Sequence, residues 1–421
     1  MEQHMILTPF LDDADVILYA GDCIEVMARM PGSSVDAIVT DPPYGLEFMG
    51  KGWDGFGTPL GFQTWTEAWA VEAFRVLKPG GHLLAFAGTR TYHRMASGVE
   101  DAGFEIRDCI AWMYGSGFPK SLDVSKAIDK AAGAEREVVG TRTTGIGTGY
   151  GNTAFIGDSE NKNLTAPATP EAKAWNGWGT ALKPAFEPVV VARRPLIGTV
   201  AANVLENGTG ALNIDACRIG TNGETIATPQ SDPHKRGATA GEYAISTRDT
   251  ERMHAAQQAS IERTNTLGRW PANIALDATA AKMLDEQSGE LPGASSFSRP
   301  SIYKATSYTA GNAKLQLGYG DNGGASRFFY TAKASRQDRN VGGLADNTHP
   351  TVKPTDLMRW LIRLVTPPGG IILDPFGGSG STGLAARAEN VRCILIEREP
   401  EYLQIIRDRL AQQNLFAERV E

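Results

Sequence analysis

The sequence predicts an α/β protein with a doubly wound, mostly parallel sheet. Short apolar segments alternate with helical patterns over residues 16–113, and the same alternation returns from Pro354 onwards. Such alternation is typical of a parallel sheet with helices on both faces. Between these parts, glycines and small polar residues replace the periodic pattern, which indicates inserted segments outside the regular alternation.

The first part begins with a strand at residues 16–19 and a helix at residues 24–30. Gly21-Asp22 separates the two, and Pro31-Gly32 ends the helix. The next helix ends at Lys78-Pro79-Gly80-Gly81 for the same reason. The further elements that we expect here are a strand at residues 37–40, a helix at 64–77, a strand at 82–87, a helix at 92–102 and a strand at 104–113.

The middle of the chain divides into two stretches of different character. Residues from about 116 to 185 are rich in Gly, Thr, Ser and Asn, and we expect a loop insertion there, with Trp175 and Trp178 anchoring it to the core. A strand follows at residues 187–192. Residues 196–325 mix short helical and strand signals with polar turns. The chain therefore divides into the regions 1–195, 196–325 and 326–421.

Composition and charge exclude some classes of protein. With 42% apolar and 21% charged residues among 421, the chain is an ordinary globular one. No apolar run approaches the length of about 18 residues that a membrane-spanning helix needs. The N-terminus lacks the pattern of a secretory signal, so we expect a cytoplasmic protein. The net charge of -7 argues against a wholly basic nucleic-acid binder, although residues 180–340 carry slightly more basic than acidic side chains.

The cysteines and histidines do not form a metal-binding pattern. The chain has four cysteines and six histidines, all scattered, with no pair of cysteines at the spacing of a zinc site. We therefore expect no structural or catalytic metal, and free thiols of the kind found in a reducing compartment. The cysteines are Cys23, Cys109, Cys217 and Cys393.

One tetrapeptide, Asp41-Pro42-Pro43-Tyr44, has the composition of a pocket for a flat ring that carries an amino group. It directly follows the apolar run 35–40. Each proline fixes φ at about −65° and donates no backbone hydrogen bond, so the carbonyl groups around the prolines can accept from a ligand. Asp41 adds a further acceptor, and Tyr44 offers a face for stacking, which suits a nucleobase. Taken alone, the two prolines could also simply end a strand and begin a loop.

A second constellation lies near the C-terminus. The apolar run 371–373 meets Asp374 and a glycine-rich turn that opens a helix, and Glu397 ends the next expected strand at residues 392–396. Glu397 is positioned there to hold vicinal ribose hydroxyls. By spacing alone the pattern also fits an NAD-dependent oxidoreductase, whereas a P-loop is excluded because no Gly-Lys-Ser/Thr follows. The glycines that satisfy the G-x-G-x-x-G spacing are Gly378, Gly380 and Gly383.

The acid before those glycines separates the alternatives. Asp374 suits a positively charged amino group, such as the methionine end of S-adenosylmethionine, and would repel a pyrophosphate. Upstream, Thr351 and Lys353 precede a helix that begins at Pro354 and ends at about residue 365. The amides at the start of that helix, together with Lys353, suit a carboxylate. The amino, carboxylate and ribose groups of S-adenosylmethionine would then each have a partner.

Taken together and in this order, the motifs resemble the beta class of DNA amino-methyltransferases. They are Asp41-Pro42-Pro43-Tyr44, then His349-Pro350-Thr351-Val352-Lys353-Pro354, then Asp374-Pro375-Phe376-Gly377-Gly378-Ser379-Gly380-Ser381-Thr382. The resemblance is to site-specific methylases of phages and prophages, and it covers residues 14–115 and 325–413 well. It implies a circularly permuted S-adenosylmethionine-dependent methyltransferase fold. In such a fold the catalytic half (1–195) precedes the cofactor-binding half (326–421), with a target-recognition region (196–325) inserted between them.

The resemblance assigns roles to individual residues. The catalytic residues would be Asp41, Pro42, Pro43 and Tyr44. Asp22 would contact the adenine of the cofactor. The full set of cofactor-binding residues would be Asp22, Thr351, Lys353, Asp374, Phe376, Gly377, Gly378, Ser379, Gly380 and Glu397.

The activity that the resemblance implies is methyl transfer from S-adenosylmethionine to the exocyclic amino group of a flipped-out base in double-stranded DNA. The aspartate of the tetrapeptide favours adenine N6, and cytosine N4 stays open as the alternative. A homodimer is implied, and no metal is needed. An NAD-dependent oxidoreductase and a DNA-binding protein that has lost catalysis are remoter alternatives. We expect the loop at residues 48–56 to close over the base, and the candidate base-reading side chains are Arg193, Arg194, Lys235, Arg236, Arg269 and Arg327.

Overall fold

The structure is a computed structural model. It describes residues 7–46, 54–115, 117, 121–141, 163–221, 247–290, 323–332 and 352–417. The chain forms two compact units, one made of Met1–Met113 with Glu187–Glu421 and the other of Tyr114–Phe186. Among the predicted site residues, Thr351 lies outside the described residues, as do most of the expected base-covering loop, Lys235 and Arg236.

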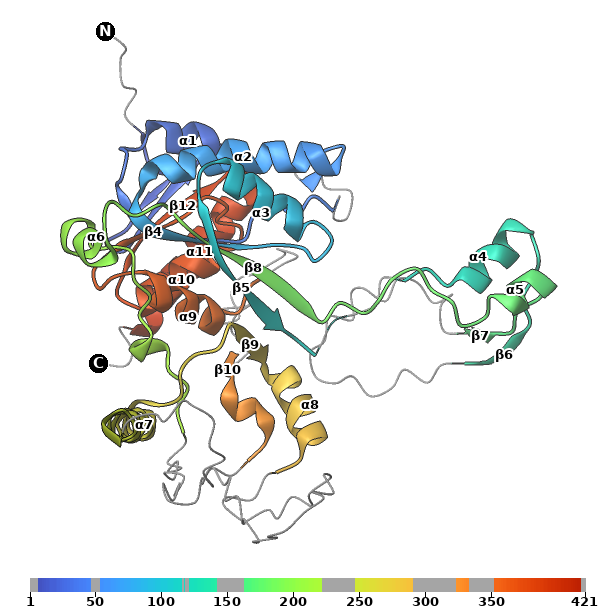
Figure 1. Ribbon diagram of the computed structural model, residues 1–421. Coiled ribbons are helices and arrows are strands. Elements are labelled where there is room, and N and C mark those ends of the chain that lie inside the picture. Colours follow the sequence, from blue (N-terminus) through green and yellow to red (C-terminus); the bar gives the residue numbers. More distant parts are fainter. Residues whose placement is uncertain are drawn as a thin grey trace, which may run out of the picture. The chain divides into compact units, whose positions relative to one another are not determined.

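The first unit is built on a ten-stranded sheet with the order β1-β2-β12-β11-β3-β4-β8-β5-β9-β10 (Figure 1). In that order the strands are Leu11–Asp12, Val16–Ala20, Arg392–Glu397, Ile371–Asp374, Val35–Thr40, Leu77–Phe86, Phe186–Arg193, Glu105–Met113, Ile274–Asp277 and Tyr330–Ala332. The pairs from β2 to β4 and from β5 to β10 are parallel, whereas β1 with β2 and β4 with β8 are antiparallel. The predicted mostly parallel sheet is confirmed. So is the circular permutation, because β11 and β12 come from the end of the chain and lie between β2 and β3.

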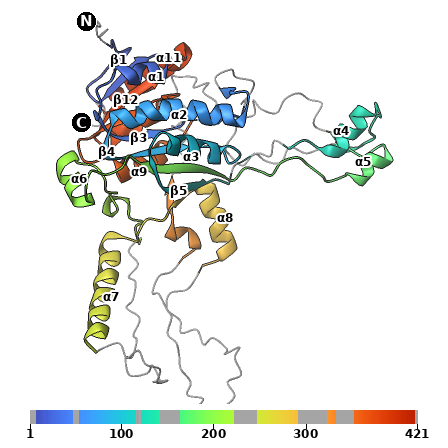
Figure 2. The ribbon, with the colours of Figure 1, turned by 45° about the horizontal axis from the view of Figure 1, so that its top comes forward.

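Helices cover both faces of the sheet (Figures 1 and 2). In β3, Ile38 packs into the same core as α1, α2 and α3, while its neighbours Ala37 and Val39 pack into the core of α9, α10 and α11. Successive side chains of a strand point to opposite faces, so one apolar strand supplies both cores. These helices are Cys23–Arg29, Pro59–Val76, Tyr92–Asp101, Thr355–Val365, Ser381–Ala388 and Pro400–Ala417.

Two elements begin five residues earlier than expected. Strand β4 begins at Leu77 instead of residue 82, because the proline and glycines expected to form a turn are instead a bulge within the strand. The pairing shifts there from Val35 with Leu77 to Ala37 with His82, and Gly80 has a φ of 78° that a side chain would disfavour. Helix α2 begins five residues earlier than expected, where Thr58 caps it by accepting from the amide of Gly61.

The second unit carries regular structure where the sequence indicated only a loop. It contains α4 (Val124–Ala131), β6 (Val138–Thr141), β7 (Asn163–Thr165) and α5 (Pro170–Ala174). Buried Asp129 organises them, because it accepts from the guanidinium of Arg136 and from the amides of Ala168 and Thr169. Such long-range acceptors have no periodic signal in a sequence.

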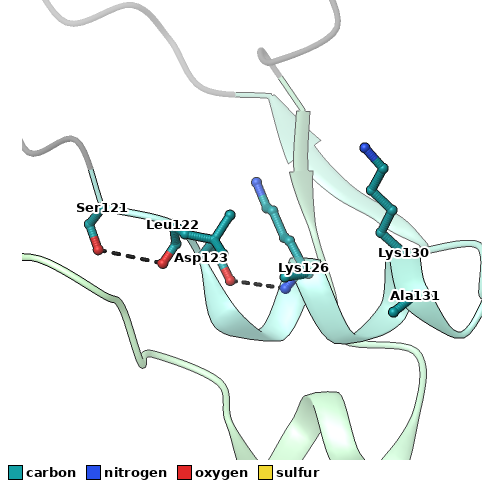
Figure 3. Close-up of a pocket in the computed structure, with 7 residues that line it drawn as sticks. Ser121, Leu122, Asp123, Lys126, Lys130 and Ala131 are labelled. Carbon is teal, nitrogen blue, oxygen red and sulfur yellow. Dashed lines mark hydrogen bonds between the residues drawn. The ribbon is translucent and has the colours of Figure 1, made fainter. Parts of the chain in front are cut away.

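The tryptophans of this unit are exposed instead of anchored in a core, contrary to the expectation from the sequence. Trp175 and Trp178 are 46% and 60% exposed and meet edge to face, with 4.9 Å between ring centroids. A hollow of the same unit lies along α4 and contains none of the predicted site residues (Figure 3). Its lining residues are Ser121, Leu122, Asp123, Lys126, Ala127, Lys130 and Ala131.

The described part of region 196–325 contains longer elements than expected. Helices α6, α7 and α8 are Val200–Asn207, Thr247–Leu267 and Ala278–Ser288. From this region β9, followed by β10 just beyond it, extends the main sheet past β5. No helix in the described ranges is long and apolar enough to cross a membrane.

Candidate active site

The predicted site residues gather at one edge of the sheet. Strands β2, β12, β11 and β3 are parallel, so their carboxyl ends meet there, followed by or ending in Asp22, Glu397, Asp374 and Asp41 respectively. From β11 the chain continues through α10 to β12 on one side, and from β3 through α2 to β4 on the other. The strand order therefore reverses between β11 and β3, and such a switch point is where open α/β sheets bind ligands.

Asp374 joins the two predicted motifs. It is 2% exposed, and its Oδ1 accepts from Thr40 Oγ1 at 2.6 Å and from the amide of Phe376 at 3.0 Å. The hydroxyl of Thr382 donates to its other oxygen. Burial raises the pKa of Asp374 to about 7, although these hydrogen bonds act in the opposite direction. The carboxylate thus fixes the glycine turn against the strand that carries Asp41, and it is available as a negative charge for an ammonium group.

The glycine turn is shaped by side chains from two later elements. Gly378 and Gly380 have φ values of 52° and 79°, which glycine adopts without strain. Glu397 Oε2 accepts from the amide of Gly378 at 2.7 Å. Arg409 of α11 is fully buried and donates to the carbonyl oxygen and, at 3.0 Å, to the hydroxyl of Ser379. Glu397 and Arg409 therefore hold the turn from the next strand and the next helix.

Two further predicted residues flank this turn. Phe376 packs against Trp65 and Trp69, with ring centroids 5.6 and 5.5 Å apart. Asp22 caps α1 by accepting from the amide of Ile24 at 2.9 Å, and the adjacent amide of Gly21 donates to the carbonyl of Glu397 at 3.0 Å. Asp22 and Glu397 thus end neighbouring strands, an arrangement that can hold an adenosine between them.

Asp41 is held by two donors. Tyr44 donates its hydroxyl to Asp41 Oδ1 at 2.7 Å, and Lys353 donates its ammonium to Asp41 Oδ2 at 2.8 Å. The backbone of the motif is fixed as well, because Thr91 donates to the carbonyl of Tyr44 at 2.6 Å and Asp54 accepts from the amide of Gly45 at 2.7 Å. These contacts orient the acceptor that the sequence predicted.

Lys353, which the sequence suggested as a partner for a carboxylate of the cofactor, contacts the tetrapeptide Asp41-Pro42-Pro43-Tyr44. Its ammonium also contacts Glu187 Oε2 at 3.1 Å and the hydroxyl of Tyr44 at 3.1 Å. It faces the rings of Phe86 and Tyr44, at 4.9 and 5.5 Å from their centroids. Pro354 caps α9 and does not lie in its first turn.

Glu187 was not predicted from the sequence. It lies near the start of β8, which is antiparallel to β4, so that start reaches the edge where the parallel strands end. The hydroxyl of Tyr44 is 2.9 Å from Glu187 Oε2. The available signal was an acid at the beginning of an otherwise apolar strand, directly before Pro188.

The charge states of this cluster follow from its contacts. Burial opposes the charge of Lys353, but the carboxylates of Asp41 and Glu187 outweigh it and raise the pKa of the ammonium. Burial and the same two carboxylates raise the pKa of the Tyr44 hydroxyl well above its usual value. Both groups therefore keep their protons and act as donors near neutral pH.

The described arginines that were candidates for base reading have partners in the protein. Arg193 donates to Glu105 at 2.6 Å, and Arg194 donates to the hydroxyl of Ser33 at 3.1 Å. Arg269 and Arg327 lie over the ring of Phe328, at 5.4 and 4.3 Å from its centroid. In the described part of the chain, no group of His, Cys, Asp and Glu side chains could hold a metal ion, and all four cysteines are free.

In sequence, this chain is similar to known DNA methylases and methyltransferases. A family model described as DNA methylase matches residues 35–132 and 233–408. The Type II methyltransferase M.HindIII of Haemophilus influenzae is 24% identical over 233 residues, which are 47% of this chain and 64% of that protein. The Type II methyltransferase M.XycI of Xanthomonas campestris pv. cyanopsidis is 38% identical over 103 residues, which are 21% of this chain and 34% of that protein. The chain thus spans between a third and two thirds of the length of these relatives.

Solved structures give weaker similarities. The PvuII DNA methyltransferase (cytosine-N4-specific) aligns with a TM-score of 0.45 and 15% identity, covering 95% of this chain and 88% of its own. The M1.HpyAVI complex with S-adenosylmethionine aligns with a TM-score of 0.39 and 15% identity, covering 94% of this chain and 98% of its own.

Proposed function

Because the chain belongs to the DNA methylase family, we propose that it transfers a methyl group from S-adenosylmethionine to the exocyclic N6 of a flipped-out adenine in duplex DNA. One observation carries this proposal. The strand end that bears Asp41 and the strand end that bears the glycine turn lie side by side at the switch point, joined by the 2.6 Å hydrogen bond from Thr40 to Asp374. A methyl donor on the turn would therefore face an acceptor held by Asp41.

The proposed cofactor contacts use the residues around the turn. S-adenosylmethionine supplies an electrophilic methyl group on a sulfonium. Asp374 would attract its amino group, Glu397 would accept from its ribose hydroxyls, and Asp22 would contact its adenine. Glycine at position 380 lets the turn pack closely against α11, since a Cβ there would lie only 3.2 Å from the side chain of Ile406. Because Lys353 contacts Asp41 and Glu187, the backbone amides that precede α9 are the proposed partners of the cofactor carboxylate.

The proposed chemistry rests on positioning. An exocyclic amine is a poor nucleophile because its lone pair is delocalised into the ring. Hydrogen bonds from the amine to Asp41 and to the Pro42 carbonyl, in the frame that Pro43 fixes, favour a pyramidal nitrogen with its lone pair directed at the methyl group. Orientation of this kind contributes up to about 7–11 kcal/mol to lowering a barrier. Extruding the base costs a few kcal/mol, which stacking on Tyr44 would partly offset.

Adenine is proposed over cytosine because the motif begins with aspartate. The fitting experiment incubates the purified protein with duplex DNA and S-adenosylmethionine labelled in the methyl group, then digests the DNA to nucleosides. Label in N6-methyldeoxyadenosine is expected. Label in N4-methyldeoxycytidine would replace adenine by the alternative target, and the absence of any label in DNA would refute methyl transfer. Calorimetry with NAD in place of S-adenosylmethionine tests the oxidoreductase alternative, for which binding of NAD is required.

The remaining parts of the proposal concern partners. Residues 196–325 are the proposed target-recognition region, and the protein is proposed to act in the cytoplasm on bacterial or phage DNA. The exposed Trp270 and Phe328, at 63% and 41%, offer aromatic surface on which DNA bases could stack. A homodimer is proposed, and sedimentation equilibrium with and without DNA measures it.

A further inference from the structure

We propose that Glu187 is a positioning residue for methyl transfer: by sharing the ammonium of Lys353 with Asp41, it leaves the catalytic cluster with an excess negative charge that Asp41 directs at the amine. This inference rests on the proposed function, because it concerns the same amine acceptor. It adds a second carboxylate and a lysine to a site that the tetrapeptide alone was expected to form.

The geometry divides one cation between two anions. Lys353 Nζ lies 2.8 Å from Asp41 Oδ2 and 3.1 Å from Glu187 Oε2, and the lysine side chain is 7% exposed. The neutral hydroxyl of Tyr44 bridges the same carboxylates at 2.7 and 2.9 Å. The cluster therefore contains two carboxylates, one ammonium and one neutral hydroxyl.

Charge balance explains why a second carboxylate matters. If Lys353 faced Asp41 alone, the buried pair would be neutral, and the carboxylate would be compensated before the amine arrived. With Glu187 present, the ammonium is shared and the cluster stays anionic. Asp374 lies on the next strand, and after burial the charge of Asp41 is one of the causes that raise the pKa of Asp374.

The reaction makes use of that excess charge. The lone pair of the amine forms the new N–CH3 bond while the S–CH3 bond breaks and its electrons go to sulfur, which leaves a thioether. The nitrogen then carries four bonds and a positive charge, until one of its protons passes to Asp41. Protonated Asp41 leaves Lys353 and Glu187 as a neutral pair, so the cluster is anionic before the step and neutral after it.

The first test compares Glu187→Gln with Glu171→Gln, an exposed glutamate of α5 in the inserted unit, which contributes no residue to the cluster. Single-turnover methyl transfer is measured with labelled cofactor. We expect Glu187→Gln to slow the chemical step about 100-fold with unchanged affinities for S-adenosylmethionine and DNA, Glu187→Asp to recover part of the rate, and Glu171→Gln to match the wild type. A wild-type rate in Glu187→Gln would overturn the inference.

A second test removes the cation. Lys353→Met leaves two carboxylates sharing one site, so one of them takes up a proton near neutrality. Because that proton is shared with Asp41, we expect the rate to fall at pH 7 and to rise with pH. In the double variant Lys353→Met/Glu187→Gln the single negative charge lies on Asp41 alone, and we expect faster transfer than in Lys353→Met. A double variant no faster than Lys353→Met contradicts the charge-balance account.

Two controls separate the possible failures. Circular dichroism melting establishes that each variant is folded, and if Lys353→Met does not fold, the comparison of the glutamate variants decides. If the wild-type protein itself transfers no methyl group, the proposed function fails. If the wild type is active and the glutamate variant is equally active, only the role of Glu187 fails.

Discussion

Two aspartates at neighbouring strand ends have hydrogen-bond partners of different charge. Asp41 is held by the ammonium of Lys353 and the hydroxyl of Tyr44, whereas Asp374 is held by two hydroxyls and an amide with no cation among these partners. Environments of this kind separate the protonation behaviour of two otherwise identical side chains. Asp41 is therefore suited to accept from an amine, and Asp374 to respond to the arrival of an ammonium group.

The raised pKa of Asp374, about 7, makes stability depend on pH. An acid whose pKa is higher in the folded state stabilises the fold fully below its ordinary value and loses that contribution as the pH rises through about 7. Asp374→Asn mimics the protonated form at every pH. We expect its Tm to rise relative to the wild type as the pH increases from about 5 to about 8, measured by calorimetry without cofactor. Parallel curves for the two proteins would show that the acid is ionised throughout.

At the scale of elements, the glycine turn depends on a helix that follows it in the sequence. Arg409 of α11 is buried and donates to Ser379, and Glu397 at the end of β12 accepts from Gly378. The turn between β11 and α10 is therefore ordered by the next strand and the next helix. A preformed turn reduces the ordering that cofactor binding would otherwise require.

This dependence predicts that Arg409→Met weakens both the fold and cofactor binding. Removing the guanidinium leaves the Ser379 carbonyl without its donor in the core, which costs about 1–3 kcal/mol. We expect a lower Tm and an affinity for S-adenosylmethionine reduced about tenfold, since about 1.4 kcal/mol corresponds to that factor. Arg407→Met, an exposed arginine of the same helix, is the matched control and should change neither. If the two variants have the same Tm and the same affinity for S-adenosylmethionine, Arg409 does not support the turn.

At the scale of the whole molecule, the chain forms one unit built on the ten-stranded sheet and a second unit inserted into its sequence. Tyr114–Phe186 has its own hydrogen-bonded core around Asp129, and the amide of Tyr114 donates to the carbonyl of Ala185 at 2.9 Å where the chain enters and leaves it. The described residues of the switch-point cluster all come from the first unit. The inserted unit is thus separable in sequence and in hydrogen bonding.

Separability predicts that residues 115–184 can be replaced by a short Gly-Ser linker. The ends of the insertion are already adjacent, so closing them adds little loop entropy. We expect the shortened protein to fold and to bind S-adenosylmethionine with the affinity of the full chain, measured by calorimetry on both in parallel. Loss of cofactor binding in a folded, shortened protein would show that the insertion supports the cofactor site.

Sequence patterns predicted the parts of the site that depend on neighbours in the chain. A strand ends in an acid at Asp41, where two prolines follow, and at Asp374, where a glycine turn follows, and so these strand ends and the permuted fold could be anticipated. Glu187 could not, because its role depends on an antiparallel strand bringing it to Tyr44, 143 residues away in sequence. The contact of Lys353 with Asp41 spans 312 residues and was missed for the same reason.

The central claim is that Asp41 accepts the amine during methyl transfer to a base in DNA. Its most direct test compares Asp41→Ala with Asp408→Ala, an exposed aspartate of α11, in single-turnover transfer from labelled S-adenosylmethionine to duplex DNA. We expect Asp41→Ala to lose transfer while calorimetry shows cofactor binding largely retained, and Asp408→Ala to transfer like the wild type. Methylation of duplex DNA by Asp41→Ala at the wild-type rate would contradict the account.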